Sequence, residues 1–207
     1  MPAIRSVTVY AASSRRAPPD QIDLAAELGR GLAGRGWTLV YGGARIGLMG
    51  ALADAALGAG GRVEGVILDT FARVAHASLH ALETVGDMRS RKAGLAHRGD
   101  AYVVLPGGFG TLEELSEILV ERQLGFHTKP LLVVNHRGFW DPLLALVDRQ
   151  VRDGLVHESY RGLLTFVPDV AATLAALDEH ARAPASDPIV DLAKLEGGPP
   201  VAEREQG

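Results

Sequence analysis

Short apolar runs alternate along the chain with longer stretches in which apolar residues recur at helical spacing. The apolar runs predict strands at Ser6–Ala11, Trp37–Tyr41, Arg62–Leu68, Leu79–Val85, Ala101–Leu105, Pro130–Asn135 and Leu163–Val167. The stretches with helical spacing predict helices at Asp20–Arg35, Leu48–Gly58, Asp87–Arg98, Thr111–Leu124, Phe139–Arg152 and Val170–Ala181. Asp87 is placed to cap the third of these helices.

The alternation of strands and helices favours a parallel sheet, because nearly continuous apolar strands must be covered on both faces. The expected fold class is therefore α/β, a Rossmann-like doubly wound parallel sheet with helices on both faces in a single domain. We expect this nucleotide-binding domain to span residues 1–182. The segment 183–207 is rich in Pro, Gly and charge, which predicts a poorly ordered tail, with a short docking segment at Ile189–Leu195 as the alternative.

The composition narrows the class of protein without identifying a reaction. Hydrophobic residues make up 47% and charged residues 22%, and the net charge is −4, so no broad nucleic-acid surface is expected. The absence of cysteine excludes disulfides, thiolate metal sites and a cysteine nucleophile. No apolar run approaches the roughly 20 residues of a membrane span, and the apolar part of the N-terminus is too short for a signal peptide. These features favour a cytoplasmic protein that does not contact membranes.

The first segment with chemical potential is a glycine-rich loop, Pro106–Thr111, between an expected strand and an expected helix. In open parallel sheets, ligands bind beyond the carboxyl ends of the strands. The glycines allow a close backbone approach, and the helix that follows offers free N–H groups to a phosphate. A tight turn without a ligand is the alternative. The loop matches neither the P-loop nor the dinucleotide fingerprint.

Glu114 has two interpretations. Thr111 to Glu114 fits a capping box, in which Thr111 is the N-cap and the Glu114 side chain returns to the helix start. Alternatively, Glu114 stands one turn inside a phosphate site, where a carboxylate can activate water or stabilise a cationic sugar.

The segment Asp87–Lys92 places Arg89, Arg91 and Lys92 near the start of an expected helix. Cations oppose the helix dipole there, and such local conflicts concentrate at functional sites. A solvated basic face is the alternative. If the site is functional, we expect Arg91 to pair with Glu114 and to hold it ionised and oriented.

Two further loops follow expected strands. Gly42–Gly50 could form a wall of a nucleotide pocket, or it could serve only the packing of helix against sheet. Ser13 and Ser14 could donate hydroxyls to a phosphate, with surface solvation as the alternative. The pair His76 and His80 has helical spacing but no evident carboxylate partner or third ligand, so no metal site is expected.

Together these segments resemble the LONELY GUY family of cytokinin-activating phosphoribohydrolases, many of whose members carry a lysine decarboxylase label. The family pattern Pro-Gly-Gly-x-Gly-Thr-x-x-Glu is complete from Pro106 to Glu114. The family's Arg-Lys pair after a Met corresponds to Arg91 and Lys92 after Met88. The glycine-rich loop Gly42–Gly50 also corresponds, and the order matches over roughly residues 5–180.

The resemblance implies hydrolysis of the N-glycosidic bond of a cytokinin riboside 5′-monophosphate, and of AMP as well, to the free base and ribose 5-phosphate. It implies no metal or organic cofactor, and it implies a homodimer. Glu114 and Arg91 correspond to the catalytic residues. The implied contacts to substrate and phosphate come from Gly107, Gly108, Gly110, Thr111, Met88, Lys92, Ser13 and Gly43.

The chain departs from the family pattern at several positions. Arg89 replaces a frequent His, Ala44 replaces the third glycine of the early loop, and Leu95 replaces a common Met. The first loop begins Ala11-Ala12 where the family usually has Cys-Gly.

Three other functions compete with this interpretation. Lysine decarboxylation commonly needs pyridoxal phosphate on a lysine, and Lys92, Lys129 and Lys194 show no such context. A nucleotide-binding sensor or carrier would lack turnover, but it would gain little from Glu114. A general purine-nucleotide glycosidase acting on AMP shares every sequence feature described above.

Overall fold

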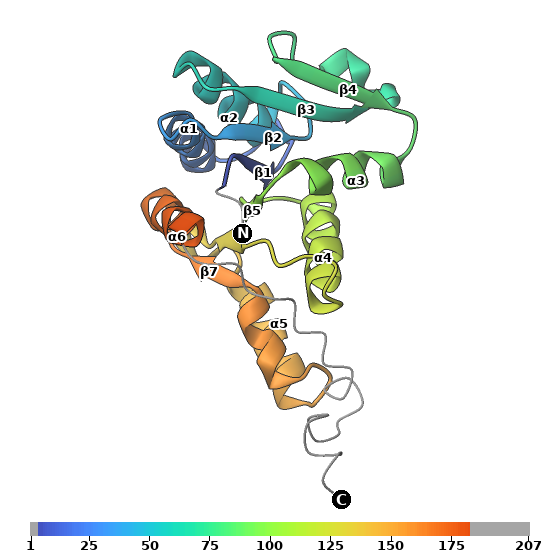
Figure 1. The fold of residues 1–207 in the computed structure, drawn as a ribbon, viewed down its shortest axis with the longest axis vertical. Helices are drawn as coiled ribbons and strands as arrows, with labels where there is room; N and C mark the ends of the chain where they lie inside the picture. Colours follow the sequence, from blue (N-terminus) through green and yellow to red (C-terminus); the bar gives the residue numbers. More distant parts are fainter. Residues whose placement is uncertain (1–3, 183–207) are drawn as a thin grey trace, which may run out of the picture.

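A computed structural model describes residues 4–182, so the tail expected at 183–207 lies outside the described residues. Figure 1 shows one twisted sheet with helices on both sides. All seven strands are parallel, in the order β4-β3-β2-β1-β5-β6-β7. Their bounds are β1 Ser6–Tyr10, β2 Thr38–Tyr41, β3 Val63–Leu68, β4 Ala81–Val85, β5 Ala101–Val104, β6 Leu131–Val134 and β7 Thr165–Val167.

The two faces of the sheet form separate apolar cores, as expected for a doubly wound fold. Along β1, Val7 and Val9 belong to one core, whereas Tyr10 belongs to the other. The first core is covered by α1 Pro19–Ala33, α2 Gly47–Gly58 and α6 Val170–Arg182. The second core receives buried residues of α3 Met88–Arg98 and α4 Phe109–Gln123, and α5 Asp141–Arg152 packs against it. The predicted fold class is confirmed.

The strand order reverses between β1 and β5. From β1 the chain adds strands in one direction as far as β4, and it then returns to place β5 on the other side of β1. Val7 lies opposite Ala101 in this pairing. The loops after β1 and β5 therefore diverge to opposite faces, which opens a crevice at the carboxyl ends of these two strands.

The predicted elements are all present, with shifts at their ends. Asp87 caps α3, because its carboxylate accepts a hydrogen bond from the Ser90 backbone N–H at 2.9 Å. Helix α5 begins at Asp141 rather than at the predicted Phe139. A short 3-10 turn, His136–Gly138, precedes it, and Pro142 suits the first turn of the helix. Among the described helices, none combines the length and apolar character that crossing a bilayer requires.

Candidate active site

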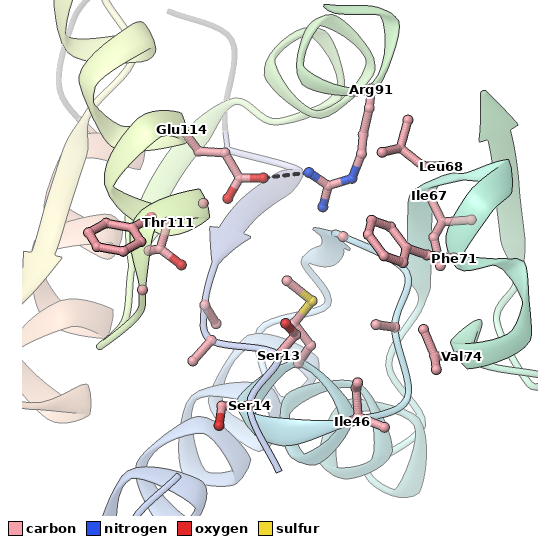
Figure 2. A pocket seen from close by; sticks show the side chains of 18 of the residues that line it. Ser13, Ser14, Ile46, Ile67, Leu68, Phe71, Val74, Arg91, Thr111 and Glu114 are labelled. Atoms are coloured by element: carbon pink, nitrogen blue, oxygen red, sulfur yellow. Dashed lines mark hydrogen bonds and ion pairs between the residues drawn. The ribbon is translucent and has the colours of Figure 1, made fainter. Parts of the chain in front are cut away.

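A cavity of about 610 Å³ opens at the carboxyl ends of β1, β2, β3 and β5, where the strand order reverses. Figure 2 shows the cavity with side chains entering from both halves of the sheet. Its lining comes from five loops and helix starts: Ala11, Ala12, Ser13, Ser14, Gly42, Ala44, Ile46, Met49, Ile67, Leu68, Phe71, Val74, Met88, Arg91, Gly108, Phe109, Gly110, Thr111 and Glu114.

Arg91 and Glu114 form a buried ion pair on the wall of this cavity. Nη1 of Arg91 donates to Oε1 of Glu114 at 2.7 Å, and both residues are buried. Figure 2 shows Arg91 reaching from α3 toward Glu114 on α4. Burial raises the pKa of the Glu114 carboxyl, and the Arg91 guanidinium opposes that rise. Burial makes the Glu114 carboxyl costly to ionise, and its partner Arg91 is the cation that favours the ionised form.

Gly42 makes room for Arg91. A Cβ built on Gly42 would overlap Nη2 of Arg91 and would lie 3.1 Å from Sδ of Met49. Gly42 is the first residue after β2, and its missing side chain lets the guanidinium pass close to the backbone. The glycine-rich loop therefore has a role beyond packing the helix on the sheet.

Gly43, by contrast, does not line the cavity. It has a φ of +74°, and a Cβ there would lie 3.1 Å from Cβ of Ile67 and 3.0 Å from Leu82. The structure therefore places Gly43 in the packing between the β2 loop and β3. The neighbouring Ala44 lines the cavity and forms a β-bridge with Ala75.

The loop after β5 leads into the N-terminus of α4. Gly108 is the N-cap and the helix begins at Phe109, so Thr111 is the third helical residue. Of the two interpretations of Glu114, the capping box is wrong, since Thr111 lies too far into the helix to cap it and Glu114 instead pairs with Arg91. The first N–H groups of α4 have no partner within the helix and lie beside the cavity.

The glycines of this loop differ in their positions. Gly108 and Gly110 line the cavity, whereas Gly107 does not. A Cβ on Gly107 would overlap the side chain of Thr111, which is buried and also lines the cavity. Gly107 thus makes room for the Thr111 side chain and is not itself part of the cavity wall.

Figure 2 shows the serines of the first loop below Thr111, and the Ala12 N–H donates to the Pro106 carbonyl at 3.3 Å. Ser13 and Ser14 both contribute to the lining. Gly47, with a φ of +62°, packs against the backbone of this loop, and the N–H of Met49 donates to the carbonyl of Ala12 at 3.3 Å. The start of α2 therefore holds the serine loop in place.

Lys92 points away from the cavity. Its Nζ lies 2.5 Å from Oε1 of Glu113 and 3.1 Å from Oε2 of Glu117. The structure therefore does not bring Lys92 to the expected substrate site, whereas Met88 lies on the cavity wall. Lys92 forms a second link between α3 and α4 beside the Arg91–Glu114 pair.

An apolar wall lies across the cavity from Glu114 and was not predicted from the sequence. It consists of side chains from the β2 loop, from α2, from the end of β3 and from the 3-10 helix Asp69–Val74: Ile46, Met49, Ile67, Leu68, Phe71 and Val74. Figure 2 shows Phe71 and Val74 beside Ile67 on this side. The apolar residues Phe71 and Val74, shortly after the predicted strand Arg62–Leu68, could have indicated this wall. They follow neither a helical nor a strand period, so the sequence pattern did not mark them.

His76 has a carboxylate partner that the sequence did not reveal. Its Nε2 lies 3.0 Å from Oδ1 of Asp54 on α2, and its Nδ1 accepts from the Ser78 N–H at 3.2 Å. Within residues 4–182, no group of three or more metal-ligating side chains comes together. Lys129 donates to the Ala96 carbonyl at 2.7 Å and lies outside the cavity.

Comparisons with known proteins place the chain in a family. Residues 49–177 match the family described as "Possible lysine decarboxylase". A probable cytokinin riboside 5′-monophosphate phosphoribohydrolase of Oryza sativa subsp. japonica is 43% identical over 178 residues, which cover 85% of this chain and 78% of the relative. A cytokinin riboside 5′-monophosphate phosphoribohydrolase of Rhodococcoides fascians is 40% identical over 179 residues, which cover 85% of this chain and 90% of the relative.

The solved structures support the fold. The molybdenum cofactor carrier protein of Chlamydomonas reinhardtii superposes with a TM-score of 0.67 at 23% identity, over 84% of this chain and 96% of that chain. A molybdenum cofactor binding protein of Rippkaea orientalis gives a TM-score of 0.66 at 19% identity, with coverage of 84% and 96%. At these identities the likeness concerns the fold alone.

Proposed function

The chain belongs to the LONELY GUY family of cytokinin riboside 5′-monophosphate phosphoribohydrolases, and from this membership we propose that it is a hydrolase of the same reaction. It cleaves the N-glycosidic bond of a cytokinin riboside 5′-monophosphate and releases the free base and ribose 5-phosphate. The observation that carries the proposal is the buried Arg91–Glu114 pair on a cavity that also holds the N-terminus of α4.

The phosphate binds at the start of α4. The helix dipole and the free N–H groups near Gly110 and Thr111 favour an anion there. The hydroxyls of Ser13, Ser14 and Thr111 are further donors on the same cavity. Binding of the phosphate fixes the ribose relative to Glu114, which explains a requirement for the monophosphate over the riboside.

Glu114 is the catalytic carboxylate. When the bond between the base and C1′ breaks, positive charge develops on the sugar, as in glycoside hydrolysis. The ionised Glu114 stabilises this charge and accepts a proton from the water that attacks C1′. The base leaves with the bonding electrons and takes up a proton from solvent, and Glu114 releases to solvent the proton it accepted, so that one water is consumed in all. Arg91 keeps Glu114 ionised and fixes one of its oxygens, so that the other remains available to the water.

The apolar wall supports a prenylated base as the preferred substrate. An adenine that carries an N6-prenyl group adds an apolar surface that AMP lacks, and Phe71, Val74 and Ile46 offer a matching surface. AMP is a slower substrate in this proposal, because it shares the phosphate, ribose and adenine but leaves the wall without a partner.

We also propose that the protein acts as a homodimer. The outer face of α4 carries Leu112 and Val120, which are 38% and 50% exposed. Phe109 at the start of the helix continues this face at helical spacing, is 93% exposed and also borders the cavity. An apolar stripe of this kind on a helix is typical of a protein interface. The cytoplasmic location expected from the sequence stays a prediction.

The test is a comparison of three substrates. Purified protein is incubated with N6-isopentenyladenosine 5′-monophosphate, AMP and the unphosphorylated riboside, and the free base is followed by chromatography. We expect release from the prenylated monophosphate to be fastest, release from AMP to be slower, and release from the riboside to be absent. Equal release from both monophosphates would indicate a general nucleotide glycosidase.

Two variants accompany the substrates. Glu114→Gln is expected to lower turnover by about 10²–10⁴-fold, the usual contribution of a general base, while nucleotide binding by calorimetry persists. Glu27→Gln makes the same change on the exposed face of α1 and is expected to leave turnover unchanged. Binding without turnover in the unaltered protein would make it a nucleotide carrier or sensor and would refute the proposed reaction.

A further inference from the structure

Two successive residues of α3 cross-link it to α4. Arg91 pairs with Glu114 at 2.7 Å, and the next residue, Lys92, pairs with Glu113 at 2.5 Å and with Glu117 at 3.1 Å. The Lys92 side chain is only 18% exposed although it lies outside the cavity. A lysine held between two carboxylates, next to a catalytic ion pair, calls for a role other than substrate contact.

The charges around Glu114 show what Lys92 does. Glu113 precedes Glu114 directly, and Glu117 follows it by one helical turn, so three carboxylates gather on the first turns of α4. Like charges at this spacing disfavour each other's ionised forms. Arg91 and Lys92 bring two positive charges from α3, and Lys92 is the residue that pairs with both Glu113 and Glu117 among the described ion pairs.

The other groups that face Glu114 do not take over this role. On β1, burial and the charge of Glu114 raise the pKa of Tyr10, so its hydroxyl stays neutral. Burial raises the pKa of Glu114 itself, the charge of Arg91 lowers it, and the charges of Glu113 and Lys92 act on it in opposite directions. Lys92 therefore offsets at Glu114 a repulsion that comes from its own partner Glu113.

We propose that Lys92 is a positioning residue of the reaction, which neutralises Glu113 and Glu117 and fixes α3 against α4 so that Glu114 stays ionised beside Arg91. This inference rests on the proposed function for its kinetic consequence, and it assigns Lys92 no contact with the nucleotide. Lysine suits the task because its compact ammonium can serve two carboxylates at once through separate donors.

The kinetic test compares three variants with the same substrate. The ionisation of the substrate phosphate then affects every variant equally and does not explain a difference between their pH profiles. In Lys92→Met, kcat at about pH 6 is expected to fall about tenfold, while kcat at about pH 8.5 stays within about twofold and KM changes little. Lys92→Arg is expected to keep the profile of the unaltered protein. Adding Glu113→Gln and Glu117→Gln to Lys92→Met is expected to restore kcat at low pH.

The double variant Glu113→Gln with Glu117→Gln, in which Lys92 remains, provides a test that does not depend on the folding of Lys92→Met. It is expected to move the acidic limb of kcat to lower pH, because it removes two repelling charges. A loss of kcat that is equal at every pH in Lys92→Met, or a change in KM alone, would overturn the proposal. So would a double variant with an unchanged profile.

A second measurement does not require turnover. The Glu114 carboxyl carbon is titrated by ¹³C NMR in the unaltered protein and in Lys92→Met, with the signal assigned by its loss in Glu114→Gln. A higher midpoint in Lys92→Met is expected, and an equal midpoint would overturn the inference. If the unaltered protein released no base but the midpoint still rose, the proposed reaction would fail while the role of Lys92 at Glu114 would stand.

Discussion

Gly42 and Arg91 lie so close together that a Cβ at Gly42 would overlap Nη2 of the arginine. The backbone at Gly42 has an ordinary φ, so alanine is disfavoured here by space and not by conformation. Gly42→Ala is therefore expected to displace the Arg91 guanidinium and to lower kcat/KM by about 10–100-fold, the scale on which small misplacements of catalytic groups act. Steady-state kinetics with the prenylated monophosphate measure this effect.

The matched control for that change is Gly58→Ala. Gly58 is the last residue of α2, and a Cβ there would meet no other atom within 4 Å. Activity is expected to stay unchanged, and stability is expected to rise by up to about 0.5–1 kcal/mol, because alanine loses less conformational entropy in a helix. An active Gly42→Ala protein with the same kcat/KM as the control would contradict the assigned role of Gly42.

The pKa of Glu114 sets the acidic limit of the reaction. Burial raises this pKa above the ordinary value of 4.5, and the base is active only when ionised. Activity is therefore present above the raised pKa and is lost as the pH falls through it. We expect the acidic limb of kcat to have a midpoint above 4.5. Since the substrate phosphate titrates near pH 6, binding to Glu114→Gln at each pH serves as the control. A midpoint at or below the ordinary value would contradict this assignment.

Phe71 is expected to set the preference for a prenylated base. It lies on the apolar wall and is 57% exposed, so its truncation removes contact surface without opening the core. In Phe71→Ala, kcat/KM for the prenylated monophosphate is expected to fall about tenfold, and kcat/KM for AMP is expected to stay within about twofold. Phe126→Ala, at an exposed position outside the cavity, should change neither value. Equal losses for both substrates would place the prenyl group elsewhere.

The features that the sequence predicted correctly are those set by local pattern. Central strands such as Ala101–Val104 are buried on both faces, so each appears as an unbroken apolar run. Asp87 caps α3 through residues only three positions away. The link between Arg91 and Glu114 was predicted from two motifs at helix starts, although the strands before them, β4 and β5, are not neighbours in the sheet.

The features that the sequence did not predict depend on contacts between distant segments. Phe71 becomes a cavity wall only because β3 lies two strands from β1 in the sheet, and no period marks the 3-10 helix that carries it. The start of α4 was misplaced because Thr111 and Glu114 imitate a capping box, whereas Arg91 from another helix takes the Glu114 carboxylate. Lys92 was assigned to the substrate because its partners, Glu113 and Glu117, were identified only in three dimensions.

The outer face of α4 is expected to hold two copies of the chain together. Light scattering behind size exclusion should give the mass of a dimer, and Val120→Asp should shift it toward the monomer, because a buried unpaired carboxylate in an apolar interface is costly. Val120 does not line the cavity, so the change acts on the interface and not on substrate contacts. Ala175→Asp adds the same charge at an exposed position of α6 and should leave the mass unchanged. A monomeric mass for the unaltered protein at micromolar concentration would refute the dimer, and a dimeric Val120→Asp protein would place its interface on another face.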